Sequence, residues 1–276
     1  MRRLIQVMLF FSLFGTGCAK PTAQTVNHSS AGQNFNGEIT VLLYNIHHAN
    51  PPAAPAVIDL NAIANVIRQQ QPHLVALQEV DVHTSRSGIG LHESDELAGL
   101  TGMKSYFGKA IDYGGGEYGV AILSKYPLSD VKNYSLPTAV STGGERRTLA
   151  TAIITFPDGK KIIFASTHLD AQKEDTNRML QIRKIVEILK QEKLPVLIAG
   201  DFNAIPGSRV INVLDSFFTR SCINSCGFTI PVINPNKTID FIAFSPSDKF
   251  SVSSHRVIDE KYASDHLPVR AVIQLK

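Results

Sequence analysis

The chain has 276 residues, of which 43% are hydrophobic and 18% charged, a composition typical of a folded globular protein and not of a disordered or fibrous one. The formal net charge of +3 falls to +1 (3 − 2) without the two N-terminal arginines, which excludes the basic footprint of a tight nucleic-acid binder. No internal repeat and no linker follows residue 40, which favours one domain over residues 38–276.

The first feature in chain order is an apolar segment near the N-terminus. Two arginines precede an apolar stretch at 4–14, and small residues then lead to Cys18. This layout predicts a signal peptide at 1–17, because the stretch is too short to span a bilayer comfortably. Cys18 resembles the lipidated cysteine of bacterial lipoproteins, and residues 18–37 are predicted to form a flexible tether. A plain secretory signal cut after Ala19 is the alternative.

Either form of the signal predicts an exported protein of the bacterial cell envelope, in the outer membrane or periplasm. A lipid on Cys18 would hold the protein at a membrane surface. In an exported chain, Cys222 and Cys226 are most simply a disulfide.

The remaining chain mixes predicted strands with predicted helices. Strands are expected at 39–45, 74–79, 118–123, 147–156, 161–167, 195–200, 238–244 and 267–275, and helices at 58–71, 92–101, 177–191 and 208–215. In the third helix, the spacing predicts that Leu180, Ile185, Ile188 and Leu189 face the core. The pattern indicates an α+β fold in which two sheets can pack face to face.

Acid, amide and histidine side chains stand at the ends of these apolar runs. They are Asn45, Glu79, His168, Asp201, Asn203 and the pair Asp265-His266. One polar side chain at a strand end is ordinary. Several side chains of metal-ligand or acid/base type indicate that the strand ends converge on one hydrolytic site.

Two residues after a predicted buried strand have the chemistry of a hydrolytic centre. Asp201 can orient or deprotonate a nucleophile, and Asn203 can hold a phosphoryl oxygen. A turn closed by an Asx hydrogen bond is the alternative for this segment. Glu79 ends another apolar run, where a hard cation such as Mg²⁺ would neutralise its buried charge; an exposed strand-end glutamate is the alternative.

Two histidines complete the set of candidate residues. Asp240 lies within a predicted strand, where aspartate is disfavoured, so it needs a partner. His266 is the natural partner, since an Asp-His pair orients an imidazole for proton transfer or phosphate binding. His168 stands at another strand end, where capping of a loop is the alternative reading.

Taken together and in order, these segments resemble the motifs of the endonuclease/exonuclease/phosphatase superfamily over about 39–275. They are Asn45, Leu77-Gln78-Glu79, Ser166-Thr167-His168-Leu169-Asp170, Gly200-Asp201-Phe202-Asn203, Ile239-Asp240-Phe241 and Ser264-Asp265-His266-Leu267-Pro268. The resemblance implies a four-layer α/β/β/α sandwich with two packed mixed β-sheets. It also implies a phosphoesterase that depends on a divalent metal, usually Mg²⁺, with Mn²⁺ as an alternative.

The resemblance also assigns roles to individual residues. Glu79 resembles the metal-ligand glutamate, with Asn45 beside it and Asp265 assisting. Asp201 resembles the residue that orients or activates the attacking water, and Asn203 the amide that positions phosphate. Asp240 and His266 resemble the Asp-His pair, and His168 stands where members contact phosphate or the leaving group. Whether Asp201 or His266 is the general base stays open.

Four further residues are candidate phosphate contacts: His47, His48, Arg86 and Arg147. Ordinary surface or packing roles are as compatible with the sequence. The segments around His47 and Arg86 resemble a bacterial subgroup that is itself similar to the C-terminal domain of calcofluor-white-hypersensitive proteins. The segment 168–172 is similar to secreted sphingomyelinases, while 49–52 departs from the subgroup pattern in the loop after the histidines.

The sequence therefore predicts an exported, metal-dependent phosphodiesterase whose substrates are phosphoesters of phospholipid or sphingolipid headgroups. A secreted Mg²⁺-dependent nuclease is the alternative, and a binding module without catalysis is a third reading. We expect a monomer that forms no stable nucleic-acid complex.

Overall fold

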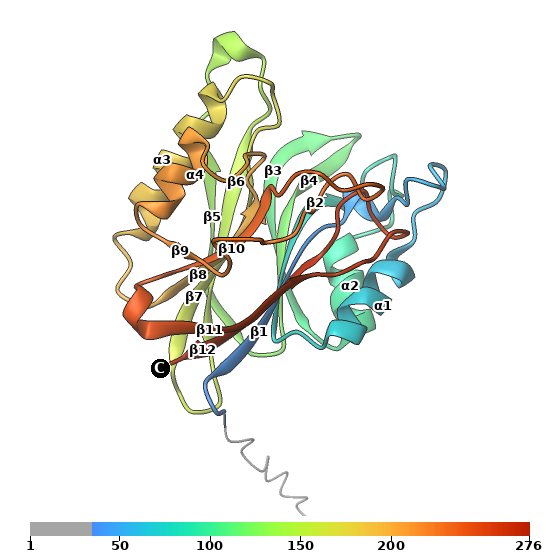
Figure 1. The fold of residues 1–276 in the computed structure, drawn as a ribbon. Coiled ribbons are helices and arrows are strands. Elements are labelled where there is room, and N and C mark those ends of the chain that lie inside the picture. The colour runs from blue at the N-terminus through green and yellow to red at the C-terminus, as the bar shows by residue number, and fades with distance from the viewer. Residues whose placement is uncertain (1–34) are drawn as a thin grey trace, which may run out of the picture. The chain divides into compact units, whose positions relative to one another are not determined.

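The computed structural model describes residues 35–276, so the predicted signal peptide, Cys18 and most of the predicted tether lie outside the described residues. Two six-stranded sheets pack against each other, and helices cover their outer faces (Figure 1). This arrangement confirms the α+β, four-layer sandwich. Within the described residues, no helix is long and apolar enough to cross a membrane.

The first sheet has the strand order β11-β12-β1-β2-β4-β3. Its strands are β1 (Glu38–Asn45), β2 (Leu74–Val82), β3 (Lys104–Tyr113), β4 (Gly116–Ser124), β11 (Phe250–Val257) and β12 (Val269–Leu275). Its outer face is covered by α1 (Leu60–Gln70) and α2 (Glu93–Thr101). Helix α1 begins where the Asp59 side chain accepts the N–H of Ala62, which satisfies a free helix donor.

The second sheet has the strand order β5-β6-β7-β8-β10-β9. Its strands are β5 (Leu128–Leu136), β6 (Arg147–Thr155), β7 (Lys161–His168), β8 (Val196–Asp201), β9 (Thr219–Arg220) and β10 (Asp240–Ser245). Helices α3 (Thr176–Leu189) and α4 (Arg209–Asp215) cover its outer face. Three single 3₁₀ turns lie in loops, at His47–Ala49, Val140–Thr142 and Ser247–Lys249.

The main core lies between the two sheets. Val41, Ile122 and Phe164 are fully buried there, together with apolar residues from most of the other strands. The central strands are buried on both faces, which explains why their sequences are nearly continuous apolar runs instead of alternating ones. Burial of these runs supplies the main driving force for the sandwich.

The register of the strands brings their polar ends to one edge. Strands β1 and β2 are parallel and pair Asn45 with Gln78, and strands β7 and β8 are parallel and pair His168 with Asp201. Strand β10 runs antiparallel to β8 and begins at Asp240, opposite Asp201. The ends of both sheets therefore present their polar residues side by side.

Four strands were not predicted, and all four are the edges of their sheets: β3, β5, β9 and β11. Edge strands are half exposed and lack the continuous apolar run that identified the central strands.

The prediction that Leu180 faces the core is wrong, because this residue is 38% exposed. The buried face of α3 instead carries the polar Gln181 beside Met179, since the Gln181 side chain accepts the N–H of Asp170 at 2.9 Å. The predicted disulfide between Cys222 and Cys226 is present.

Candidate functional site

The carboxylate of Asp201 lies at the centre of the polar groups at the shared strand edge. Its Oδ2 is 3.2 Å from Nδ2 of Asn45, 3.5 Å from Nε2 of His168 and 3.7 Å from Nε2 of His266. Its Oδ1 accepts the backbone N–H of Asn203 at 2.8 Å. These groups come from four chain segments, as expected if the strand ends converge on one site.

His266 is held as a cation by the buried carboxylate of Asp240. Its Nδ1 lies 3.0 Å from Oδ2 of Asp240. Burial by itself lowers the pKa of His266, but the charge of Asp240, their hydrogen bond and the nearby Asp201 outweigh burial and raise it to about 10. At neutral pH, His266 is therefore an imidazolium whose Nε2–H points toward Asp201.

His168 is neutral, because its other ring nitrogen faces an arginine. Nδ1 of His168 lies 3.2 Å from NH1 of Arg147, and a guanidinium can only donate, so Nδ1 accepts and the proton sits on Nε2. Burial, followed by the charges of Arg147 and His266, lowers the pKa of His168 well below its ordinary value. Nε2 also lies 3.1 Å from Nδ2 of Asn203. With the proton on Nε2 of His168, Nδ2 of Asn203 donates to the backbone oxygen of Leu169 at 3.0 Å, and the Nε2–H of His168 is directed toward Oδ2 of Asp201 at 3.5 Å.

Asp201 is the group in this cluster that titrates near neutrality. Burial and the adjacent Asp240 carboxylate raise its pKa, while His266 and the hydrogen bonds from Asn203 and Asn45 lower it, with a net value of about 7. A carboxylate with such a pKa can both accept and release a proton under physiological conditions.

Glu79 lies at a β-bulge beside this cluster. The register between β2 and β4 shifts between Gln78 and Val80, and Glu79 has a φ of +58°. A bulge leaves one residue out of the ladder and re-aims its side chain. Oε1 of Glu79 accepts Nδ2 of Asn45 at 2.9 Å, which ties the predicted metal-ligand glutamate to β1.

The donor set around Glu79 fits a divalent cation. Two groups of potential metal-ligating side chains occur among residues 35–276, one formed by Glu79, His47 and His48 and one by Asp201, Asp240 and His266. The second group is already internally hydrogen-bonded, whereas Oε2 of Glu79 has no hydrogen bond within the described part of the chain. Asp265 belongs to neither group; its Oδ1 accepts Ser264 Oγ at 3.4 Å. Its role as a metal ligand stays a prediction.

Both arginines that were candidate phosphate contacts are held by acidic partners. Arg147 is buried, and its NH1 lies 3.0 Å from Glu145 Oε1 as well as beside His168. Arg86 is only partly exposed and donates to both oxygens of Asp81, at 2.7 and 2.8 Å. Asp81 is buried, which raises its pKa, but the hydrogen bonds from Arg86 and its neighbours outweigh burial and lower it.

Three residues near the site were not predicted as functional. Tyr118 is buried beside Glu79 and Arg147, and burial, followed by the Glu79 charge, raises its phenol pKa. Ser264 donates to the backbone oxygen of Asn45 at 2.7 Å, which joins β1 to the segment that carries His266. Asp81 fixes Arg86. Asp81 could have been singled out from the sequence, because aspartate is disfavoured inside strands. Tyr118 could not, because tyrosine is common in strands.

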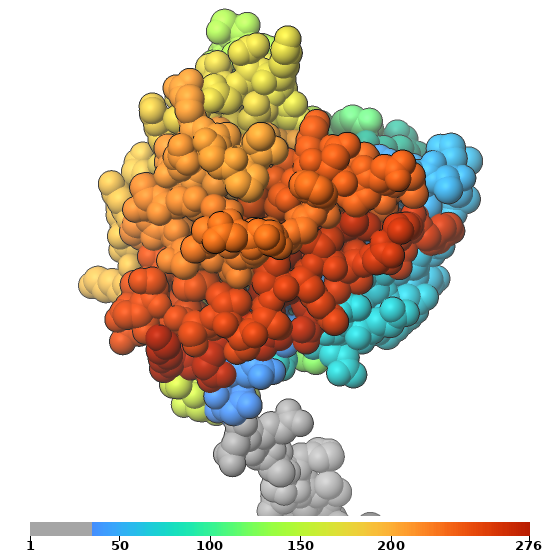
Figure 2. Space-filling model, in the orientation of Figure 1, coloured from blue at the N-terminus to red at the C-terminus, as the bar shows by residue number. Residues whose placement is uncertain are grey.

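A groove with apolar walls leads away from the cluster. Its first part, of about 480 Å³, is lined by Asn203 together with Ile205 and Lys237. Ile205 and Lys237 also line a second part of about 730 Å³, whose other walls include Ile223 and Phe228. The segments 223–228 and 236–238, which line this second part, belong to the part of the chain coloured orange in Figure 2.

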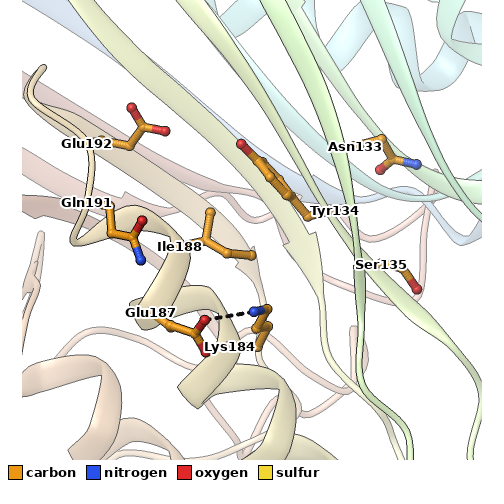
Figure 3. A pocket seen from close by; sticks show the side chains of 8 residues that line it. All are labelled: Asn133, Tyr134, Ser135, Lys184, Glu187, Ile188, Gln191 and Glu192. Atoms are coloured by element: carbon orange, nitrogen blue, oxygen red, sulfur yellow. Dashed lines mark hydrogen bonds and ion pairs between the residues drawn. The ribbon is translucent and has the colours of Figure 1, made fainter.

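Another hollow lies between β5 and α3, away from the strand ends. It has a volume of about 460 Å³, and its walls include Tyr134 and Ile188 (Figure 3). Lys184 in this hollow is paired with Glu187 at 2.8 Å, so its charge is not free for an anionic ligand. The hollow holds none of the buried acid, amide and histidine groups described above, and the site is therefore assigned to the strand ends.

Comparisons with known proteins agree with this geometry. A model of the endonuclease/exonuclease/phosphatase family matches residues 42–266. The uncharacterized Escherichia coli protein YbhP is 27% identical over 248 residues, which cover 85% of this chain and 96% of that protein.

Solved structures show the same fold. An endonuclease/exonuclease/phosphatase family protein from Bacteroides thetaiotaomicron superposes with a TM-score of 0.72 at 19% identity, over 87% of this chain and 98% of that one. A mannosyl-6-phosphatase from the same species superposes with a TM-score of 0.66 at 19% identity, over 85% of this chain and 99% of that one.

Proposed function

Because the chain belongs to the endonuclease/exonuclease/phosphatase family, we propose that it is a divalent-metal-dependent phosphodiesterase of the bacterial cell envelope. The observation that carries this proposal is the placement of Asp201 between a neutral histidine and a cationic one, beside Glu79. A water at Asp201 would lie near the N–H donors of His168 and His266, which can bind phosphoryl oxygens, and near Glu79, which can bind a cation. Phosphoryl transfer requires groups of both kinds.

The protonation states favour Asp201 as the general base. His266 already carries its proton because Asp240 stabilises the imidazolium, so it cannot accept another. His168 keeps its proton on Nε2 because Arg147 occupies Nδ1. Asp201, with a pKa of about 7, is the group able to take a proton from water.

The hydrolytic step then follows from these roles. The water oxygen attacks phosphorus as its proton passes to Asp201, and the bond from phosphorus to the alcohol oxygen breaks. His266 and the donors on His168 and Asn203 stabilise the negative charge on the phosphoryl oxygens. When bound at Glu79, with Asn45 beside it, a divalent cation supplies further neutralisation of that charge. The proton that Asp201 took from water passes to the leaving oxygen, so the alcohol leaves neutral and the Asp201 carboxylate is restored.

The groove beside Asn203 supports a substrate with an apolar part. Ile205, Ile223 and Phe228 are 51%, 63% and 53% exposed, although large apolar side chains usually avoid water. Ile205 lines the first part of the groove together with Asn203, and Ile223 and Phe228 line the second part. This arrangement fits a phospholipid or sphingolipid headgroup ester whose phosphate lies near Asn203 and whose apolar part extends over these residues. Near-neutral charge disfavours the alternative, a secreted nuclease, because nucleic acid is held mainly through phosphate contacts.

Export is part of the same proposal. The N-terminal pattern of two arginines, an apolar stretch and Cys18 supports a signal peptide and a lipid anchor at a membrane surface. The disulfide between Cys222 and Cys226 supports an oxidising compartment such as the periplasm. We propose that the protein acts there as a monomer.

A parallel substrate screen tests the proposed function. The full chain is incubated with sphingomyelin, phosphatidylinositol, plasmid DNA, RNA, sugar phosphates and bis-p-nitrophenyl phosphate, each with Mg²⁺ or Mn²⁺ and with EDTA. We expect EDTA-sensitive release of a headgroup from a lipid. Cleavage of DNA without cleavage of lipid contradicts the lipid assignment, and no hydrolysis with any divalent metal contradicts the enzymatic one.

A further inference from the structure

The turn after β1 holds three consecutive residues in a backbone conformation that side chains disfavour. His47, His48 and Ala49 have φ values of +48°, +43° and +52°. L-residues disfavour this conformation, and runs of such residues persist where the surrounding structure imposes them. The turn is held by the Asn50 side chain, which donates to the backbone oxygen of Val57 at 2.6 Å.

This turn presents two imidazoles, each with one ring nitrogen that has no hydrogen-bond partner among residues 35–276. Nδ1 of His47 lies 2.8 Å from the backbone oxygen of Asn50, so Nδ1 carries the proton and Nε2 has a free lone pair. A protonated ring nitrogen bonded to a carbonyl is the usual support of a metal-binding histidine. Nδ1 of His48 is buried without a hydrogen-bond partner within the described residues, and a buried nitrogen left in that way is costly.

The two histidines face the carboxylate of Glu79. The two rings lie with their centroids 4.4 Å apart. One ligand atom from each of His47, His48 and Glu79 lies within 4.8 Å of the others. Ligands of one metal ion are about 3 Å apart when each bond is about 2.1 Å, so a small rotation of the side chains closes the site.

We propose that His47, His48 and Glu79 together bind a divalent transition metal, with Mn²⁺, Co²⁺ or Zn²⁺ preferred over Mg²⁺. Mg²⁺ selects oxygen ligands and keeps several waters, whereas imidazole suits transition metals. The two histidines are then metal ligands and not the phosphate contacts that the sequence suggested. The site shares Glu79 with the proposed hydrolytic centre, but its existence is testable without turnover.

Metal binding to the full chain tests this proposal directly. Isothermal titration calorimetry with Mn²⁺ and with Mg²⁺ gives the two affinities, and pulsed EPR of the Mn²⁺ complex detects nitrogen bound to the metal. The variants are His47→Asn and His48→Asn, because asparagine tolerates the left-handed backbone and removes the imidazole. The matched control is His83→Asn, which changes an exposed histidine that also has a positive φ and lies outside the cluster.

We expect Mn²⁺ to bind at least about tenfold more tightly than Mg²⁺, with a nitrogen signal in the EPR spectrum. Each of the two variants should weaken Mn²⁺ binding by about tenfold or more and change Mg²⁺ binding by less than about threefold. Equal affinities for the two metals, absence of a nitrogen signal, or the same loss in His83→Asn overturns the proposal. Thermal unfolding in EDTA, where the variants should match the parent chain, separates loss of ligation from loss of fold. Hydrolysis of bis-p-nitrophenyl phosphate, measured separately, reports on the proposed function.

Discussion

Arg147 places NH1 3.2 Å from Nδ1 of His168, and this contact decides where His168 carries its proton. Because a guanidinium has no acceptor, Nδ1 accepts and the proton lies on Nε2, on the side of Asp201, while the nearby Nδ2 of Asn203 donates to the backbone oxygen of Leu169. Because Arg147 occupies Nδ1, His168 stays neutral and can donate a hydrogen bond from Nε2. We propose that Arg147, a candidate phosphate contact from the sequence, acts by positioning His168.

Replacement of Arg147 by glutamine should release this constraint. Without the guanidinium, Nδ1 of His168 is free to take up a proton, and the pKa of His168 should rise toward its ordinary value because one of the charges that lowers it is gone. We expect kcat to fall by about 100-fold, the usual cost of misplacing a donor to a phosphoryl oxygen. Nitrogen-15 NMR of the His168 side chain reports the tautomer in the parent chain and the variant. An unchanged tautomer together with unchanged kcat contradicts the role given to Arg147.

The rate of hydrolysis should follow the ionisation of Asp201. As the general base it must be deprotonated, and its pKa is about 7, so kcat/KM should fall tenfold per pH unit below that pH and level off above it. A profile of kcat/KM from pH 5 to 9 with bis-p-nitrophenyl phosphate measures this decrease. A profile that is flat through neutral pH rules out Asp201 as the group that accepts the proton.

The interaction of His266 with Asp240 should make the stability of the fold depend on pH. The pKa of His266 is about 10 in the folded protein, against an ordinary value of 6.5. A raised pKa means that the stabilisation is fully present below pH 6.5 and is lost as pH rises toward 10. The free energy of unfolding should therefore decrease over this range by an amount on the order of a few kcal/mol.

Urea unfolding in EDTA at pH 6 and pH 10 measures this loss, with Asp240→Asn as the test variant. The variant lacks the carboxylate that raises the pKa, so its stability should change much less between the two pH values. An equal decrease in both proteins shows that other groups cause the pH dependence.

The apolar wall at Phe228 should enter a lipid surface. The chain contains no tryptophan, so Phe228→Trp introduces a single fluorescent reporter. Its emission should shift to shorter wavelength when vesicles of phosphatidylcholine and phosphatidylglycerol are added, because the indole moves out of water. Leu180→Trp is the matched control, since Leu180 is exposed on α3 and lines neither part of the groove. A response to single-stranded DNA but none to vesicles favours a nuclease instead.

The sequence predicted which polar residues gather at the strand ends, but not the contacts between them. Asp201, His168 and Asn45 could be identified because each ends a run that is apolar on both faces, and such runs mark central strands. The pairing of Arg147 with His168 could not be identified, since it depends on the register that places Leu149 of β6 opposite Thr167 of β7. Contacts of this kind arise between chain segments and leave no local pattern.

The parts of the fold that escaped prediction share a physical cause. Edge strands such as β3 and β5 gain their structure from one neighbouring strand, and half of their side chains meet water. The bulge at Glu79 could not be predicted from the sequence either, because it comes from a register shift against β4. Leu180 was placed inward by spacing alone, whereas hydrogen bonding of Gln181 to Asp170 orients the helix.

The most direct test of the proposed chemistry is the rate of Asp201→Asn on bis-p-nitrophenyl phosphate at pH 8 with saturating Mn²⁺. The amide keeps the size of the side chain and cannot accept a proton. Asp130→Asn, at an exposed position on β5, is the control. We predict that kcat falls by about 1000-fold or more in Asp201→Asn and stays within about twofold in the control. A kcat within about threefold of the parent chain in Asp201→Asn would contradict a hydrolytic centre built on this carboxylate.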